Sequence, residues 1–354
     1  MLRFDADENV STTNADLIVN TVNTVGVMGA GVAKAVKERY PDVMGPYTEK
    51  CRTRELYPGG VQALRMTDGK IVVNLASKKH FKDASEPQWV GFGLLNLSRL
   101  LSLPRMRDVK TVCLPPPGAG LGGLHPEMVQ RMIRAYLDPH TKRGVDVVVC
   151  APEWAPSAKP VRYTGVGSRE TPRDVMNVMT EVAEGLSEQE WILRSGNATG
   201  ADSAFEAGSP VQLTESYLPW EKAQVPHGIV AITDEHTRLF RSVYRTPSGG
   251  PWTPSMKRAA TLLMTRNGNQ VFGPDFVDPS DVLICWTPYG DPVGGTRQAI
   301  ALAGLIDIPV INLGHKEWAG ANAKSIISAA TQQVLERRAR LGTPIPEAGP
   351  APTL

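Results

Sequence analysis

The 354-residue sequence contains only four cysteines, and they are far apart. Cys51, Cys113, Cys150 and Cys285 show no paired spacing of the kind that binds zinc, so we expect buried thiols rather than metal ligands or disulfides. The six histidines are scattered and form no cluster either. The sequence therefore predicts no metal site and no cofactor.

Long apolar runs and a strong charge of one sign are also missing. No run reaches the length of a membrane span, and the first residues lack the apolar core of a signal peptide, so we expect a cytoplasmic protein with no membrane partner. The net charge is +2. Residues 1–153 hold 20 Lys and Arg against 16 Asp and Glu, a bias that favours a nucleic-acid-linked substrate but also fits an ordinary solvated surface.

The most informative stretch of the sequence is a strand, a glycine-rich loop and a helix in succession. The apolar run Leu17–Val19 ends in Asn20 and Asn23, the loop Gly26–Gly31 follows, and a helical pattern covers residues 32–40. Free backbone N–H groups and the positive end of the helix dipole make such a loop suitable for a diphosphate. Asn23 offers a donor and an acceptor for a sugar hydroxyl. The spacing is neither GxGxxG nor that of a P-loop.

A second glycine loop, Gly118–Leu124, also lies between a strand, Thr111–Leu114, and a helix, residues 126–137. Loops of this kind gather at one edge of an α/β sheet, so the two loops together would hold one diphosphate from both sides. The alternative interpretation is that each is a tight turn without a ligand.

Strands alternate with helices along the whole chain, which predicts an α/β protein with a mixed sheet between helices in its first half. The Pro- and Ala-rich residues 154–160 predict a linker between domains 1–153 and 161–340, and residues 341–354 predict a loose tail. Residues 221–254 are expected to be irregular, as a lid or an insertion, and residues 255–266 to form a helix.

Four segments carry a resemblance to a known family: Asn20–Asn23, Gly26–Gly31, Ser77–Phe81 and Gly118–Leu124. Their order and approximate spacing resemble those of DarG-type macrodomains, over roughly residues 1–151. The resemblance implies the ADP-ribose-binding fold and ADP-ribose or ADP-ribosylated DNA as partner. It further implies an ADP-ribosyl glycohydrolase that removes ADP-ribose from thymidine-linked DNA, in a toxin-reversal or phage-conflict role.

The same resemblance implies roles for individual residues. Lys78 would be the catalytic lysine, and Asn23 would face the distal ribose. An acidic residue near the amino terminus usually recognises adenine; an alignment without gaps gives Asn9, whereas Asp7 requires a two-residue shift. Relatives that act on protein carboxylates carry an aspartate where this chain has Gly122. The implied ADP-ribose-binding residues are Asn9, Asn20, Gly26, Val27, Met28, Gly29, Gly31, Gly118, Ala119, Gly120, Leu121 and Gly122.

A lysine amine is a plausible nucleophile for the anomeric carbon of the distal ribose once it has lost its proton. Lys79, His80 and Lys82 nearby would make the charged form of Lys78 less favourable. The alternative for this segment is a solvent-exposed basic loop. Two other functions also stay open: capture of ADP-ribose derivatives or cyclic ADP-ribose signals without turnover, and removal of ADP-ribose from protein.

The second half contains small residues, hydroxyls and one arginine at three strand-to-helix turns, a pattern that suits a phosphate, a nucleotide or a nucleotide-sugar. It resembles the Rossmann-like SLOG superfamily, which contains DprA and the LOG phosphoribohydrolases, over about residues 161–315. Residues 293–299 lack the later glycine and the glutamate of the LOG motif PGGxGTxxE, which favours a binding role over phosphoribohydrolase activity. A scaffold without a ligand is the alternative, and oligomerisation through this half stays open. The implied binding residues are Gly167, Ser168, Arg169, Ser195, Gly196, Asp202, Gly294, Gly295 and Thr296.

Overall fold

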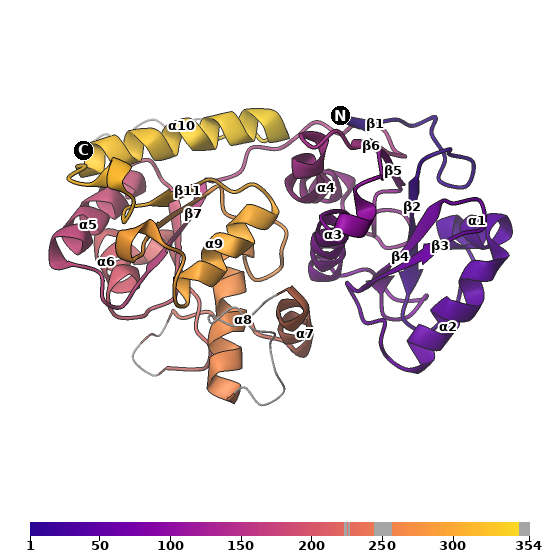
Figure 1. Cartoon of the computed structure of the whole chain (residues 1–354), viewed down its shortest axis with the longest axis horizontal. Helices are drawn as coiled ribbons and strands as arrows, with labels where there is room; N and C mark the ends of the chain where they lie inside the picture. Colours follow the sequence, from indigo (N-terminus) through magenta and orange to yellow (C-terminus); the bar gives the residue numbers. More distant parts are fainter. Residues whose placement is uncertain (223–224, 226, 244–256, 347–354) are drawn as a thin grey trace. The chain divides into compact units, whose positions relative to one another are not determined.

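The computed structural model describes residues 1–222, 225, 227–243 and 257–346 and divides into two compact units (Figure 1). Unit 1 comprises Met1–Pro156 with Asp275–Val277, and unit 2 comprises Ser157–Pro274 and Asp278–Leu354. The division at Pro156 falls inside the predicted linker. Among the described residues, no helix is both long and apolar enough to cross a bilayer. In the same part of the chain, no three His, Cys, Asp or Glu residues are grouped so that they could hold a metal ion.

Unit 1 is built on a six-stranded mixed sheet with the order β1-β6-β5-β2-β4-β3. All neighbouring strands run parallel except β3, which pairs antiparallel with β4. The mixed sheet predicted for this half is confirmed. The strands are β1 (Leu2–Phe4), β2 (Leu17–Asn23), β3 (Val61–Arg65), β4 (Ile71–Lys78), β5 (Thr111–Leu114) and β6 (Asp146–Val149).

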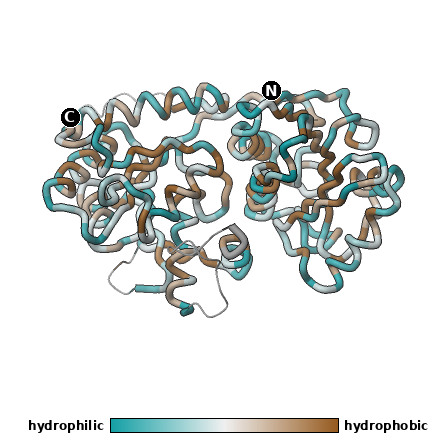
Figure 2. The backbone as a smooth tube through the Cα atoms, viewed as in Figure 1, coloured by the Kyte–Doolittle hydropathy of each residue, from teal (hydrophilic) through white to brown (hydrophobic). Residues whose placement is uncertain are grey.

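Helices cover both faces of this sheet, which is why β2 is apolar over successive residues rather than alternating. One face packs against α1 and α2, through residues such as Val36 and Tyr47. The other face is covered by α3 and α4, and Figure 2 shows hydrophobic residues gathered along the strands. The helices are α1 (Gly31–Arg39), α2 (Met44–Arg52), α3 (Pro87–Leu101) and α4 (Pro126–Thr141), with short 3-10 helices η1 (Pro41–Val43) and η2 (Pro104–Met106).

Three buried amide side chains form a ladder across the central strands of unit 1. Asn20 of β2 donates from Nδ2 to Oδ1 of Asn74 on β4 (2.8 Å), and Asn74 donates in turn to Oε1 of Gln62 on β3 (3.1 Å). Gln62 Nε2 donates to the carbonyl of Pro46 in α2 (3.0 Å). Because buried polar groups are costly without partners, this ladder fixes the register of β2, β4 and β3.

Unit 2 contains a five-stranded sheet with the order β11-β10-β7-β8-β9, parallel at every pair. The parallel sheet is thus observed, whereas the assignment of unit 2 to a Rossmann-like domain of the SLOG superfamily stays a prediction. The strands are β7 (Arg162–Gly167), β8 (Ile192–Ser195), β9 (Thr214–Ser216), β10 (Val282–Trp286) and β11 (Val310–Asn312).

The helices of unit 2 lie on both faces of its sheet. Helices α5, α6 and α10 share one hydrophobic core with the strands, and α8 and α9 pack together against β8 and β10. The helices are α5 (Arg173–Ser187), α6 (Ala201–Gly208), α7 (Asp234–Val243), α8 (Arg258–Phe272), α9 (Thr296–Leu305) and α10 (Ala323–Leu341), with 3-10 helices η3 (Val211–Leu213), η4 (Pro288–Gly290) and η5 (Lys316–Trp318).

Two predicted segments of unit 2 differ from the structure. Residues 221–254 are not wholly irregular, because they include α7, which starts with a reciprocal pair of bonds between Thr233 and His236. Within this stretch, residues 223–224, 226 and 244–254 lie outside the described residues. Helix α8 does not stop at Arg266 but continues to Phe272, since its polar last turns are buried against the sheet.

The amide ladder predicts that a variant without its central residue is less stable than the wild-type chain. Asn74→Ala leaves the Gln62 acceptor buried without this donor and leaves the Asn20 donor with only the weak sulfur acceptor of Met28, so we expect the free energy of unfolding of unit 1 to fall by about 3 kcal/mol. Asn14→Ala, on the exposed turn before β2, is the matched control and is expected to change stability by less than about 0.5 kcal/mol. Urea unfolding of the full chain compares the two variants. Equal stability of both would contradict a structural role for the ladder.

Candidate functional site

The two glycine loops of unit 1 line one cavity of about 380 Å³, a volume typical of small-molecule sites. The first loop follows β2, the second follows β5, and the end of β4 lies at the same place. Because β2, β4 and β5 are parallel neighbours, their carboxyl ends meet at one edge of the sheet. The predicted residues that line the cavity are Asn23, Val27, Gly29, Gly31, Lys78, Gly118, Gly120, Leu121 and Gly122.

Lys78 is the last residue of β4, and its half-buried side chain lines the cavity. The register between β2 and β4 shifts at the end of β2, so that Asn23 pairs with Lys78. Nζ of Lys78 donates a hydrogen bond to the carbonyl oxygen of Leu121 in the second loop. The exposed Lys79 side chain lies instead over the ring of Trp89, with Nζ 5.4 Å from the ring centroid. The two lysines separate because Lys78 ends β4, whereas Lys79 begins the bend that follows the strand.

Asn23 holds the first loop in place. Its Nδ2 donates to the carbonyl of Val27 (2.6 Å), and its Oδ1 accepts from the backbone N–H groups of Val25 (3.1 Å) and Val27 (3.3 Å). The hydroxyl of Tyr47 donates to the backbone carbonyl of Asn23 (2.8 Å). Burial raises the pKa of Tyr47, which keeps this donor protonated. Both ends of the Asn23 amide therefore bond to the loop itself.

The second loop is folded tightly on itself at Gly122. Its carbonyl accepts from the backbone N–H of Ser85 (2.9 Å). A Cβ at Gly122 would lie 2.2 Å from the carbonyl oxygen of Gly118 and 2.5 Å from Oγ of Ser85. Only glycine fits this position without a shift of the loop. A Cβ at Gly120, which also lines the cavity, would meet nothing within 4 Å.

Five predicted residues do not line this cavity. Asn9 is exposed and its Oδ1 accepts from the N–H of Ser11 (2.9 Å), and Asp7 is exposed as well, so the choice between them stays a prediction. Asn20 belongs to the buried ladder, and Met28 is buried in the core beside it. The five predicted residues outside the lining are Asn9, Asn20, Gly26, Met28 and Ala119.

Cys150 is one of the cavity residues that are absent from the predicted binding set. Cys150, just after β6, lines the cavity and lies with Sγ 3.1 Å from Sγ of Cys113 on β5. All four cysteines are free; Cys113 and Cys285 are buried as expected, whereas Cys51 and Cys150 are half-buried. The hydrogen bond between Cys150 and Cys113, together with burial, raises the pKa of the Cys150 thiol, which makes it a poor nucleophile. Adjacency of β5 and β6 was the only signal that would have found this pair.

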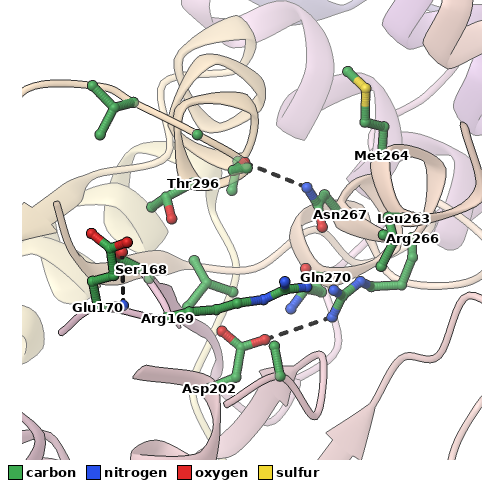
Figure 3. A pocket seen from close by; sticks show the side chains of 17 residues that line it. Ser168, Arg169, Glu170, Asp202, Leu263, Met264, Arg266, Asn267, Gln270 and Thr296 are labelled. Atoms are coloured by element: carbon green, nitrogen blue, oxygen red, sulfur yellow. Dashed lines mark hydrogen bonds and ion pairs between the residues drawn. The ribbon is translucent and has the colours of Figure 1, made fainter. Parts of the chain in front are cut away.

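Unit 2 contains a second cavity, of about 400 Å³ (Figure 3). It is bordered by the turn after β7, the turn before α9 and one side of α8. Ser195 is buried and donates to the carbonyl of Gly165 (3.0 Å), so it does not face this cavity, and Gly196 lies behind its wall. The predicted residues that line the cavity are Gly167, Ser168, Arg169, Asp202, Gly294, Gly295 and Thr296.

Helix α8 contributes three polar cavity residues that the sequence missed: Arg266, Asn267 and Gln270. Asn267 Nδ2 donates to Oε1 of Gln298 (2.9 Å), which ties α8 to α9. The helix predicted from the sequence ended at Arg266, whereas α8 continues through Asn267 and Gln270 to Phe272. The i,i+4 spacing of Arg266 and Gln270 places both on one helix face, and this spacing is the sequence feature that could have indicated that they act together.

The guanidinium of Arg266 faces the carboxylate of Asp202, with Nη1 3.6 Å from Oδ2 (Figure 3). Both side chains are buried. Burial raises the pKa of Asp202 to about 6, against the opposing effect of Arg266, and burial lowers the pKa of Arg266. The attraction between the two charges therefore does not fully offset the free-energy cost of removing them from water.

Comparison with known proteins finds relatives for unit 1. Residues 19–133 match the family model described as Macro domain. The DNA ADP-ribosyl glycohydrolase of Mycobacterium tuberculosis (strain ATCC 25618 / H37Rv) is 34% identical over 143 residues, which cover 39% of this chain and 39% of that protein. The protein of the same name from Thermus aquaticus (strain ATCC BAA-2747 / Y51MC23) is 34% identical over 176 residues, 49% of this chain and 47% of that protein. Unit 1 thus contains a Macro domain with DarG-type homologues.

Among solved structures, the macrodomain of Mycobacterium tuberculosis DarG is 31% identical, with a TM-score of 0.39, and the similarity covers 43% of this chain and 99% of that chain. Thermosipho africanus DarTG in complex with ADP-ribose is 26% identical, with a TM-score of 0.37, covering 43% of this chain and 41% of that chain. The chain spans less than half of the length of the curated relatives it matches.

The packing of the second loop predicts different effects for two neighbouring glycines. Gly122→Ala forces the loop away from Gly118 and Ser85, so we expect the affinity for ADP-ribose to fall about tenfold or more. Gly120→Ala adds the same methyl group in open space and is expected to change the affinity by less than about threefold. Calorimetric titration of both variants with ADP-ribose measures the difference. The same affinity for both would show that the loop geometry at Gly122 does not shape the site.

Proposed function

We propose that unit 1 is an ADP-ribosyl glycohydrolase that removes ADP-ribose from nucleic acid, with thymidine-linked DNA as the substrate. The observation that carries this proposal is the position of Lys78, whose amine reaches from the end of β4 to the second glycine loop across the cavity. Two loops rich in backbone N–H groups suit the diphosphate of ADP-ribose, and the lysine lies beside them. The relatives named DNA ADP-ribosyl glycohydrolase support the same conclusion.

The proposed reaction begins with the unprotonated amine of Lys78. Nζ forms a bond to the anomeric carbon of the distal ribose while the bond from that carbon to the base breaks. The base leaves with the electron pair and takes up, by way of solvent, the proton that the alkylated amine releases. Water then resolves the lysine adduct, releases ADP-ribose and returns the free amine. The Leu121 carbonyl, which accepts a hydrogen bond from Nζ, holds the amine at the cavity before attack.

Gly122 favours DNA over protein as the carrier of ADP-ribose. The protein-directed relatives that this sequence resembles carry an aspartate at this position, whereas the contacts of Gly122 with Gly118 and Ser85 leave no space for a side chain. The second loop therefore offers backbone groups, and no carboxylate at this position, to the bound sugar. We infer that Asn23 supports this arrangement by holding the first loop and meets the distal ribose where it borders the cavity.

For unit 2 we propose a SLOG-like domain that binds a nucleotide or a nucleotide-sugar without turning it over. The cavity that contains Arg169, Asp202 and Gly294–Thr296 supports a binding role. No glutamate stands at the LOG motif position in residues 293–299 to support hydrolysis. The proposed domains are residues 1–153 and 161–340.

The proposal predicts opposite results for two adjacent lysines. Lys78→Ala removes the nucleophile, so we expect release of ADP-ribose from an ADP-ribosylated thymidine oligonucleotide to fall by about 1,000-fold or more, while the affinity for ADP-ribose changes by less than about threefold. Lys79→Ala removes an amine that lies over Trp89 and is expected to retain turnover within about threefold. Single-turnover assays and calorimetric titration measure the two quantities.

Full turnover by Lys78→Ala would remove this lysine from the mechanism. The wild-type chain is tested in parallel on ADP-ribosylated DNA and on ADP-ribosylated protein. Binding of ADP-ribose without turnover of either substrate would select capture of the ligand instead of hydrolysis. Turnover of modified protein alone would replace the DNA substrate.

A further inference from the structure

Two cysteines of unit 1 lie in contact at the wall of its cavity. Sγ of Cys113 is 3.1 Å from Sγ of Cys150, and both thiols are free. Cys113 belongs to β5 and is fully buried, whereas Cys150 follows β6, is half-buried and lines the cavity. A disulfide bond is about 2.0 Å long, so the two sulfurs need to approach by only about 1 Å to form one.

The sheet holds Cys113 in place and leaves Cys150 freer to move. Within β5, Cys113 is paired with Ile18 of β2 on one side and with Val148 of β6 on the other. Cys150 lies beyond the last residue pair of β5 and β6, where its N–H donates to the carbonyl of Leu114 (2.8 Å). Closure of an S–S bond therefore draws Cys150 toward the core of the sheet and away from the cavity.

The hydrogen bond between the two thiols gives them different chemistry. It lowers the pKa of Cys113, against the effect of burial, and it raises the pKa of Cys150, as burial does. Cys113 is thus the sulfur that gives up its proton more readily, and a thiolate is the form that attacks an oxidised sulfur. Cys150 is the sulfur that a small oxidant reaches from the cavity. Because the raised pKa keeps the thiolate fraction of Cys150 small, its oxidation is slow and needs sustained exposure.

We propose that Cys113 and Cys150 form a reversible disulfide when a small hydroperoxide enters the cavity, and that this bond weakens the binding of ADP-ribose. Sγ of Cys150 attacks one peroxide oxygen, the O–O bond breaks, and the departing hydroxide takes the thiol proton to give water and a sulfenic acid. Sγ of Cys113 then displaces the hydroxyl group, which leaves as a second water with the Cys113 proton. The two thiols lose two electrons, and the peroxide gains them.

This inference goes beyond the proposed hydrolase, although its effect on the ligand rests on the proposed ADP-ribose site of unit 1. A wall atom that retreats by about 1 Å loses about half of its dispersion energy with a fitted ligand. We therefore expect the oxidised cavity to bind ADP-ribose at least fivefold more weakly. By linkage, a ligand that binds the reduced form fivefold more tightly makes the disulfide easier to reduce, which raises its midpoint potential by about 20 mV at saturation.

The test uses the full chain, treated for several hours with hydrogen peroxide and compared with the same sample kept in dithiothreitol. Mass spectrometry of non-reduced peptides is expected to show Cys113 linked to Cys150. Calorimetric titration is expected to show the fivefold loss of affinity for ADP-ribose, and dithiothreitol should restore it. Titration in dithiothreitol redox buffers measures the shift of the midpoint potential by ADP-ribose. Absence of the linked peptide would overturn the proposal, as would equal affinities of the oxidised and reduced chains.

Variants assign the response to this pair, and each variant is compared with itself before and after peroxide. Cys113→Ala and Cys150→Ser cannot form the bond, so their affinities for ADP-ribose are expected to stay constant on treatment. Cys51→Ser is the matched control and should respond as the wild-type chain does. Cys51 is half-buried in the same unit, but its Sγ lies 4.0 Å from the carbonyl oxygen of Asn23. A response that persists in both Cys113→Ala and Cys150→Ser would overturn the proposal, as would loss of the response in Cys51→Ser alone.

Release of ADP-ribose from the modified oligonucleotide is measured on the same reduced and oxidised samples. Turnover and affinity that peroxide leaves unchanged would overturn this inference and leave the proposed hydrolase in place. Peroxide-sensitive binding of ADP-ribose in a chain without turnover would leave this inference standing and reject the hydrolase. A reduced chain that neither binds ADP-ribose nor turns over the oligonucleotide would reject both.

Discussion

The pairing of β2 with β4 is the interaction on which the candidate site of unit 1 depends. Both strands are buried, and the ladder from Asn20 through Asn74 to Gln62 gives partners to the amide of Asn74 and to the donor of Asn20. A slip of one residue would bury the wrong face and break that ladder. At the end of β2 the register shifts between Val22 and Asn23, and this shift places Asn23 opposite Lys78. Strand pairing in the core thereby sets the position of the amine in the cavity.

In both units, a glycine allows other atoms to approach the backbone closely at the cavity. In unit 1 the absence of a side chain at Gly122 lets the second loop fold onto Gly118, so that backbone groups line the cavity. In unit 2 its absence at Gly196 leaves space for the guanidinium of Arg266, a residue distant in sequence. One glycine shapes a loop, and the other admits a charged side chain to a buried wall.

The hydrogen bonds of the cavities change the interpretation of several predicted residues. Asn23 lines the cavity of unit 1, yet its amide is engaged by the loop that it precedes. Ser195 comes directly after the strand predicted from the sequence, but its hydroxyl donates a hydrogen bond within the sheet, to the carbonyl of Gly165. A motif locates a turn in the chain, whereas the direction of each side chain depends on the partners that packing brings to it.

Local patterns in the sequence by themselves determined the strand, loop and helix around Asn23, the second loop at Gly118–Leu124 and the α/β alternation, because glycine, asparagine and apolar periodicity act between near neighbours. They also identified Lys78, through the family resemblance. Only the tertiary structure decided that Lys78 rather than Lys79 lines the cavity, that Cys150 meets Cys113, and that α8 brings Arg266 beside Asp202. These contacts join segments far apart in the chain, and their energies come from burial and pairing that no local window of sequence contains.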